Sequence, residues 1–174
     1  MPLHGLPPIA IIDSEVLILG TFPSEESLKK ARYYANKRNQ FWKIMNYVLS
    51  SKDSENSNEQ RRLLGQFKVA LWDVLCECER NGSADSSIMR GTEKANDLCG
   101  FLRLHDSIKS IYFNGEKSFQ YFSMLIEGSC SAELHEIGKI VLPSSSSANT
   151  WYTLMQKQEI WKSKMDIRKI STER

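Results

Sequence analysis

Near its N-terminus the chain reads Val16-Leu17-Ile18-Leu19-Gly20-Thr21-Phe22-Pro23-Ser24, and this stretch decides the fold. Four consecutive apolar residues that stop at a glycine and a proline turn are typical of a strand buried on both faces of a parallel sheet. Three further apolar runs also stop at a turn former or a polar residue: Val69 to Trp72, Ile108 to Phe113, and Ile137 to Leu142. We therefore predict four parallel strands.

The segments between these runs are long enough for helices. Helical stretches are expected within Ser24–Leu49, Ile88–Leu104, Ser118–Ile126 and Asn149–Ile167. Strands that alternate with helices indicate an α/β protein, here a three-layer αβα arrangement around a central four-stranded parallel sheet. The polar stretch Ser50–Gln60 is interpreted as a surface loop.

Composition is that of an ordinary globular domain. The 174 residues are 41% hydrophobic and 25% charged, so we expect a single domain over residues 1–174. No apolar run approaches the roughly 20 residues of a membrane helix, and residues 1–8 do not read as a signal peptide. A cytoplasmic protein is therefore expected. The net charge of +2 is compatible with a nucleic-acid partner but does not require one.

The four cysteines, Cys76, Cys78, Cys99 and Cys130, match neither a disulfide framework nor a paired zinc motif. We interpret them as unpaired thiols, mostly buried. None of the three histidines falls in a metal-ligand pair. We therefore expect no metal and no cofactor.

The ends of the predicted strands carry the unusual sequence. Ligands of open α/β sheets bind at the carboxyl ends of the strands, so the chemistry is expected there. After Gly20, where the backbone can approach a flat ligand, a dense polar and aromatic run extends from Tyr33 to Trp42. Core packing explains Trp42, but it does not explain the polar side chains of Asn36, Arg38 and Asn39.

These residues resemble a known family. The run G-T-F-P-S at residues 20–24, followed by Y-Y-A-N-K-R-N-Q-F-W at 33–42, is similar to the first motif of the hypoxanthine-DNA glycosylase branch of the uracil-DNA glycosylase superfamily. Leu142 to Asn149 resembles its second motif, and Trp72-Asp73-Val74-Leu75 and Phe113-Asn114-Gly115 also fit. The resemblance implies a monofunctional enzyme that flips a deaminated base, chiefly hypoxanthine, out of DNA. It would hydrolyse the N-glycosidic bond without a metal, leaving an abasic site.

The resemblance also assigns a catalytic residue. Most of the superfamily carries an Asp or Asn that positions water after the first strand, but this chain has Phe22 there. The hypoxanthine branch shows the same loss, and its important amide corresponds to Asn39. An amide is no general base near neutral pH, so Asn39 would orient water or hydrogen-bond the departing base. Alternatively, Asn39 caps the following helix.

Several residues are candidates for holding the base. Asn114 ends the third strand, and its amide matches O6 and N1–H of hypoxanthine in a bidentate contact. It is also half of a common turn dipeptide, Asn-Gly. Phe41 is the candidate for stacking on the base, Tyr33 and Tyr34 for lining the pocket, and Phe22 for closing one wall. Core packing is the alternative for each of these aromatic residues.

The serine-rich segment after the last strand is expected to approach DNA. Hydroxyl and backbone N–H groups bind phosphates without bulky side chains. The expected DNA-binding residues are Pro143, Ser144, Ser145, Ser146, Ser147 and Asn149, with Arg38 and Lys37 as phosphate contacts. Without the resemblance, this segment reads as a flexible linker.

Two carboxylates near the second strand, Asp73 and Asp85, receive no catalytic role, and Asp85 is interpreted as a helix cap. The expected partner is DNA with deaminated bases, bound by a monomer. Two other functions stay open: a uracil or mismatched-thymine glycosylase, and a catalytically silent module that binds damaged DNA. A small-nucleotide domain ranks last because no glycine-rich phosphate loop is present.

Overall fold

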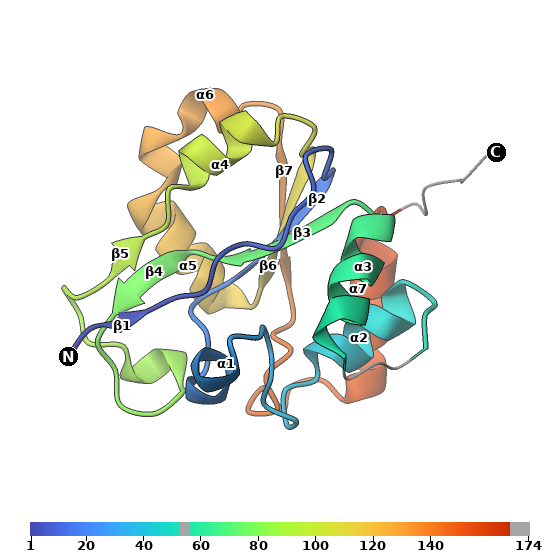
Figure 1. Cartoon of the computed structure of the whole chain (residues 1–174), viewed down its shortest axis with the longest axis horizontal. Helices are drawn as coiled ribbons and strands as arrows, with labels where there is room; N and C mark the ends of the chain where they lie inside the picture. The colour runs from blue at the N-terminus through green and yellow to red at the C-terminus, as the bar shows by residue number, and fades with distance from the viewer. Residues whose placement is uncertain (53–55, 168–174) are drawn as a thin grey trace.

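A four-stranded parallel sheet forms the centre of the computed structural model, which describes residues 1–52 and 56–167 (Figure 1). Its strands are β2 (Val16–Gly20), β3 (Val69–Asp73), β6 (Ser110–Asn114) and β7 (Gly138–Leu142), in the order β3-β2-β6-β7. All three pairings are parallel. The predicted fold class and the four predicted strands are thus confirmed, with boundaries shifted by one or two residues.

The sheet separates two apolar layers, because alternate side chains of a strand point to opposite faces. Leu17 and Leu19 of β2 join a core with α4 (Leu98–Leu104), α5 (Glu116–Leu125) and α6 (Ser131–Leu134). Val16 and Ile18 join a second core with α2 (Phe41–Val48), α3 (Ser57–Gln66) and α7 (Leu154–Lys164). Figure 1 shows these two helical layers on either side of the sheet.

The helices are shorter than predicted. The expected helical stretch from Ser24 to Leu49 contains α1 (Glu25–Lys30) and α2, separated by an irregular loop over residues 31–40. The expected loop Ser50–Gln60 was partly wrong, because Asn56 caps a helix, α3, that buries Leu64; residues 53–55 lie outside the described residues. Within the described parts of the chain, no helix has the length and apolarity needed to cross a membrane.

A second small sheet was not predicted. It is antiparallel and has the order β1-β4-β5, from β1 (Leu3–His4), β4 (Leu75–Cys78) and β5 (Lys94–Ala95). These strands are too short to produce a periodic apolar pattern. They brace the segment that follows β3 and leads to η1 (Asp85–Ser87), a short 3₁₀ helix at the edge of the site.

The prediction of four unpaired thiols was wrong for two of them. Cys99 of α4 and Cys130 just before α6 form a disulfide, whereas Cys76 and Cys78 are free thiols. The helical layer brings together two residues 31 positions apart, which their spacing in the sequence does not reveal.

Candidate active site

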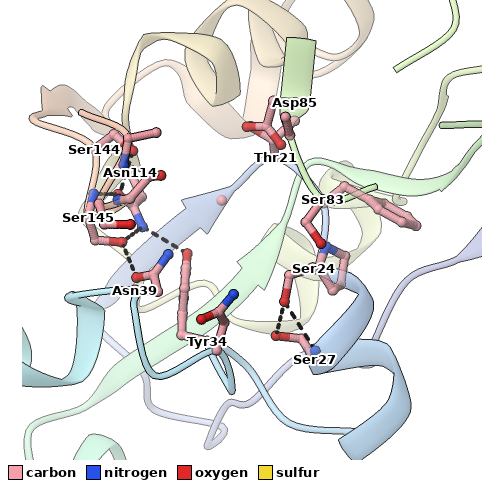
Figure 2. Close-up of a pocket in the computed structure, with 18 of the residues that line it drawn as sticks. Thr21, Ser24, Ser27, Tyr34, Asn39, Ser83, Asp85, Asn114, Ser144 and Ser145 are labelled. Atoms are coloured by element: carbon pink, nitrogen blue, oxygen red, sulfur yellow. Dashed lines mark hydrogen bonds between the residues drawn. The ribbon is translucent and has the colours of Figure 1, made fainter. Parts of the chain in front are cut away.

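A pocket of about 580 Å³ lies where the central strands end (Figure 2). That volume suits a ligand of the size of a nucleobase with its sugar. Its wall comes from four segments far apart in the sequence: the end of β2 with the loops on either side of α1, the end of β3 with η1, the end of β6, and the serine-rich segment. The residues that line it are Gly20–Ser24, Ser27, Tyr33, Tyr34, Asn36, Arg38, Asn39, Asp73, Ser83–Ser86, Asn114 and Ser144–Asn149.

Gly20 leaves space in the interior of this pocket. It pairs in register with Asp73 on the neighbouring strand. A Cβ atom on Gly20 would lie 2.4 Å from Asp73 Oδ1 and 2.8 Å from Tyr34 Oη. The two oxygens therefore converge on a point that only a glycine leaves open.

Ser145 joins two amides through hydrogen bonds, although it was predicted to face DNA. Its side chain is fully buried, and its Oγ donates to Asn39 Oδ1 at 2.8 Å. The same Oγ accepts from Asn114 Nδ2 at 2.8 Å, and the Ser145 backbone N–H donates to Asn114 Oδ1 at 2.8 Å. Figure 2 shows the three residues side by side. The network fixes both amides relative to the loop.

The orientation of the Asn39 amide follows from its partners. The backbone N–H of Phe41 donates to Asn39 Oδ1 at 2.9 Å, and Ser145 Oγ takes the second lone pair. Because a backbone N–H can only donate, the atom facing it must be the oxygen. Asn39 Nδ2 consequently faces away from these partners. The helix-cap alternative is partly right: Gln40 occupies the cap position of α2, but Asn39 supplies the side-chain acceptor.

Asn114 is positioned differently from its prediction. It lies at the end of β6 and lines the pocket, as expected. However, its Nδ2 already donates to Ser145 Oγ and to Tyr34 Oη, the latter at 3.0 Å. Both N–H donors are used, so one lone pair on Oδ1 is all that the amide can offer. The structure therefore contradicts a bidentate contact with the base and makes Asn114 an organiser of the pocket wall.

Phe41 does not line the pocket, which corrects its predicted stacking role. Its side chain is fully buried, and the Tyr34 ring stacks on it with centroids 3.9 Å apart and planes 16° from parallel. Tyr34 has a left-handed backbone, with a φ of 53°, and its ring lies on the pocket side of Phe41. Tyr34 therefore lines the pocket, and Phe41 packs behind it.

The other predicted aromatic residues do line the pocket. Phe22 forms part of the wall, and the Arg80 guanidinium lies over its ring at 5.0 Å. Arg80 also donates to the backbone oxygen of Pro23, which holds the turn after β2 in place. Tyr33 also lines the pocket, and its hydroxyl donates to the Pro7 oxygen at 2.9 Å.

The serine-rich segment has an inner and an outer part. Ser145 is buried, whereas Ser147 and Ala148 are exposed at the tip. Ser144, Ser146 and Asn149 lie between these extremes and line the pocket, whereas Pro143 does not and instead accepts a hydrogen bond from Trp161 Nε1 at 2.9 Å. This packing excludes the linker alternative, because the segment forms hydrogen bonds with Asn114 of β6, Asn39 before α2 and Trp161 of α7.

Lys157 holds the serine-rich segment in place through a hydrogen bond, and the sequence did not single it out. It lies on α7, is 1% exposed, and donates to Ser146 O at 3.0 Å and to Gln40 Oε1 at 2.9 Å. Burial lowers the pKa of its ammonium. Of the two predicted phosphate contacts, Arg38 lines the pocket and Lys37 is exposed outside it.

Two carboxyl groups were overlooked as site residues. Asp85 was predicted to cap a helix, but it does not cap η1. It lies in the pocket wall, with its Oδ1 4.0 Å from Arg80 Nη1. Burial raises the pKa of Asp85, while a hydrogen bond from Thr21 lowers it. Asp73 is 4% exposed, and its Oδ2 is buried with no hydrogen-bond partner among the described residues. Burial, followed by repulsion from Asp85, raises the pKa of Asp73 to about 8.

Comparison with known proteins agrees with this geometry. Residues 7–167 match the family model described as the uracil DNA glycosylase superfamily. The chain belongs to the uracil-DNA glycosylase superfamily. It is 32% identical over 157 residues to a hypoxanthine DNA glycosylase of Methanosarcina acetivorans, covering 90% of this chain and 94% of the relative. A hypoxanthine DNA glycosylase of Methanosarcina barkeri is 33% identical over 127 residues, or 72% and 78% of the two chains.

A solved structure shares the superfamily fold. The solution NMR structure of a Methanosarcina acetivorans protein, assigned as a uracil DNA glycosylase, superposes with a TM-score of 0.74 at 28% identity. It covers 94% of this chain and 98% of its own. Among the described residues of this chain, one group of side chains lies close enough together to hold a metal ion: Cys99, Cys130 and Glu133. These lie outside the pocket, and both sulfurs are already in the disulfide.

Proposed function

We propose that this chain is a monofunctional DNA glycosylase that removes hypoxanthine from deoxyinosine in DNA and leaves an abasic site. The relatives that bear this name span most of the chain. The pocket suits a nucleotide rotated out of the duplex, because it is hollow and its wall carries an aromatic ring and amide and hydroxyl groups. We further propose that it acts on DNA as a monomer.

The orientation of Asn39 carries the mechanistic proposal. Both lone pairs of its Oδ1 are occupied by Phe41 and Ser145, so the side chain acts as a donor through Nδ2. A residue with no free acceptor cannot take a proton from water. Of the two roles expected from the sequence, the geometry supports a hydrogen bond to the departing base.

A donor is what this reaction needs. As the N-glycosidic bond breaks, its electrons move into the base while the sugar gains oxocarbenium character. Fixed donors stabilise the charge on the base without having to reorganise, and burial strengthens them. Asn39 is preorganised by two hydrogen bonds, and Tyr34 presents a ring on which the base can stack. Water then adds to C1′ of the oxocarbenium ion, and the proton that it loses goes to the released base, directly or through solvent.

The outer part of the serine-rich segment is the proposed contact with DNA. Ser147 and Ala148 are exposed at its tip, where small side chains can approach a phosphate or the space left by the flipped nucleotide. Ser145 and Lys157 hold the inner part against the pocket. Arg38 at the pocket rim is the proposed phosphate partner.

A charge-matched pair of variants tests this role of Asn39. Asn39→Asp keeps the oxygen that accepts from Phe41 and Ser145 but replaces the donor by a negatively charged oxygen. Asn58→Asp adds the same charge at an exposed position of α3, outside the pocket. In single-turnover assays of deoxyinosine duplexes developed with hot alkali, we expect a loss of about a hundredfold or more for Asn39→Asp. Asn58→Asp should cleave like the wild type. Equal rates for all three proteins would contradict the proposal.

A further inference from the structure

The carboxyl group of Asp73 is a buried polar group in the pocket that the mechanism above does not use. It ends β3 and lines the pocket, but it is only 4% exposed. Its backbone oxygen accepts from Asn96 Nδ2 at 2.8 Å, so the strand end that carries it is held in place. By contrast, Oδ2 has no hydrogen-bond partner among the described residues. Buried polar groups without partners are rare and call for a ligand or another explanation.

The position of Asp73 in the pocket determines which edge of a flipped base it would contact. A flipped nucleotide stays attached to the DNA backbone through its sugar, so the glycosidic nitrogen must remain near the pocket mouth. The exposed tip of the serine-rich segment marks that mouth, whereas Asp73 and Gly20 lie in the interior. The interior group therefore meets the edge of the base opposite the glycosidic bond. In hypoxanthine this edge is a lactam, with N1–H beside C6=O.

From this geometry we propose that Asp73, as a neutral carboxylic acid, pairs with the lactam edge of the flipped base. This deepens the proposed function and rests on it. Because Oδ2 has almost no accessible surface, the carboxyl group turns about its Cβ–Cγ bond to bring both oxygens to the base. The acid O–H then donates to the base oxygen, and the acid C=O accepts from the base N–H. No proton is transferred. The hydrogen bond to the oxygen strengthens as negative charge moves into the departing base.

The surroundings of Asp73 favour its neutral form. The charged and titratable groups that face it are Asp85, Arg80, Tyr33 and Tyr34. Burial raises the pKa of Asp73 most and Asp85 raises it further, while Arg80 lowers it, giving about 8. The acid is therefore mostly protonated at pH 7 and loses its donor as the pH rises through that value. Burial also raises the pKa of Tyr33 and Tyr34, so both phenols stay neutral across the same range.

The contact increases the rate of excision but does not discriminate between bases. A neutral carboxyl group also pairs with the amidine edge of adenine, donating to N1 and accepting from the amino group. Asp73 therefore does not reject adenine. Uracil carries the same kind of edge as hypoxanthine, with N3–H beside C4=O, which makes the contact testable on a second substrate.

Two substitutions separate the neutral acid from other roles. Asn reproduces its donor and acceptor in nearly the same shape, whereas Leu keeps the volume and removes both. Single-turnover rates on deoxyinosine duplexes would be measured for wild type, Asp73→Asn and Asp73→Leu between pH 6 and 9.5. The ratio of wild type to Asp73→Asn is the key quantity, because ionisation of the base itself affects both proteins alike. Urea unfolding at each pH would confirm that all three are folded.

We expect the ratio of the wild-type rate to the Asp73→Asn rate to be constant near pH 6–7. Above about pH 8 this ratio should fall by about tenfold per pH unit. At pH 6.5, Asp73→Leu should be at least about tenfold slower than Asp73→Asn. A constant ratio up to pH 9.5, or equal rates for Leu and Asn, would overturn the inference. If both variants were inactive, the amide of Asn would not have replaced the neutral acid, which also overturns it.

Failure of the proposed function gives a different result. If the wild type leaves deoxyinosine intact, the same three proteins would be assayed on deoxyuridine duplexes, where the lactam contact makes the same prediction. The ratio test then decides on Asp73 independently of whether hypoxanthine is the substrate.

Discussion

Removal of the Ser145 hydroxyl should reveal how far one buried group organises the pocket. Ser145→Ala deletes the donor to Asn39 Oδ1 and the acceptor of Asn114 Nδ2 without adding bulk. Each loss leaves a polar atom short of a partner, but Phe41 and Tyr34 still contact the two amides. We therefore expect a cost of about 2 kcal/mol in the free energy of unfolding.

A second buried serine provides the control for this experiment. Ser118 on α5 is also fully buried and lies outside the pocket, and within the described part of the chain its hydroxyl makes a single hydrogen bond, to Gly115 O at 2.8 Å. Ser118→Ala should cost about 1 kcal/mol. In thermal unfolding this corresponds to a fall in Tm of about 4–8 °C for Ser145→Ala and about 2–4 °C for the control.

The two variants should differ more in activity than in stability. Without the Ser145 donor, the Asn39 amide can rotate away from the base, so single-turnover excision of hypoxanthine should fall by at least about tenfold. Ser118→Ala should stay within about twofold of the wild type. If Ser145→Ala were as stable and as active as the control, the hydrogen-bond network would not be what holds the site, and the reasoning would be refuted.

Four other changes test separate parts of the structure. Gly20→Ala places a carbon 2.4 Å from Asp73 Oδ1, so the free energy of unfolding in urea should fall by about 1–3 kcal/mol. The rate of excision should fall at least about tenfold, and an unchanged stability and rate would contradict the packing. Because burial raises the pKa of Asp73 to about 8, folding retains a proton there, and wild-type stability should fall relative to Asp73→Asn between about pH 4 and pH 8. A difference in urea midpoint between wild type and Asp73→Asn that stays the same from pH 4 to pH 9 would contradict this. Lys157→Met should destabilise by about 1–2 kcal/mol in urea, because two part-buried oxygens lose their donor, and a neutral effect would show that they find water instead. Thiol titration of the denatured, unreduced chain should find two reactive thiols, and four would exclude the Cys99–Cys130 disulfide.

The central sheet could be predicted because its strands are buried on both faces. Val16 to Leu19 and the three other apolar runs require no knowledge of distant residues to be recognised. The small sheet and α3 escaped prediction for the opposite reason. Leu3–His4 and Lys94–Ala95 pair two residues at a time, and α3 begins inside a polar stretch where Asn56 supplies the cap.

The membership of the site was easier to predict than the direction of its side chains. Asn39, Asn114 and the serine-rich segment were found from the ends of strands and from motif resemblance. Which lone pair of Asn39 is taken, and that Ser145 points inward, depends on contacts across more than a hundred residues of sequence. The same holds for Asp73: its pairing with Gly20 and its burial follow from strand register, which single runs of residues do not show.

The most direct test of the account identifies the base released from defined duplexes. Wild-type protein would be incubated with duplexes that contain deoxyinosine, uracil, or a G·T mismatch, and the free bases would be measured by mass spectrometry alongside alkali-induced strand cleavage. We predict free hypoxanthine, released faster than uracil or thymine, with strand breaks that require alkali. Faster release of uracil would keep the superfamily chemistry but contradict the substrate. Binding to all three duplexes with no base released would contradict the central claim that this protein is a glycosylase.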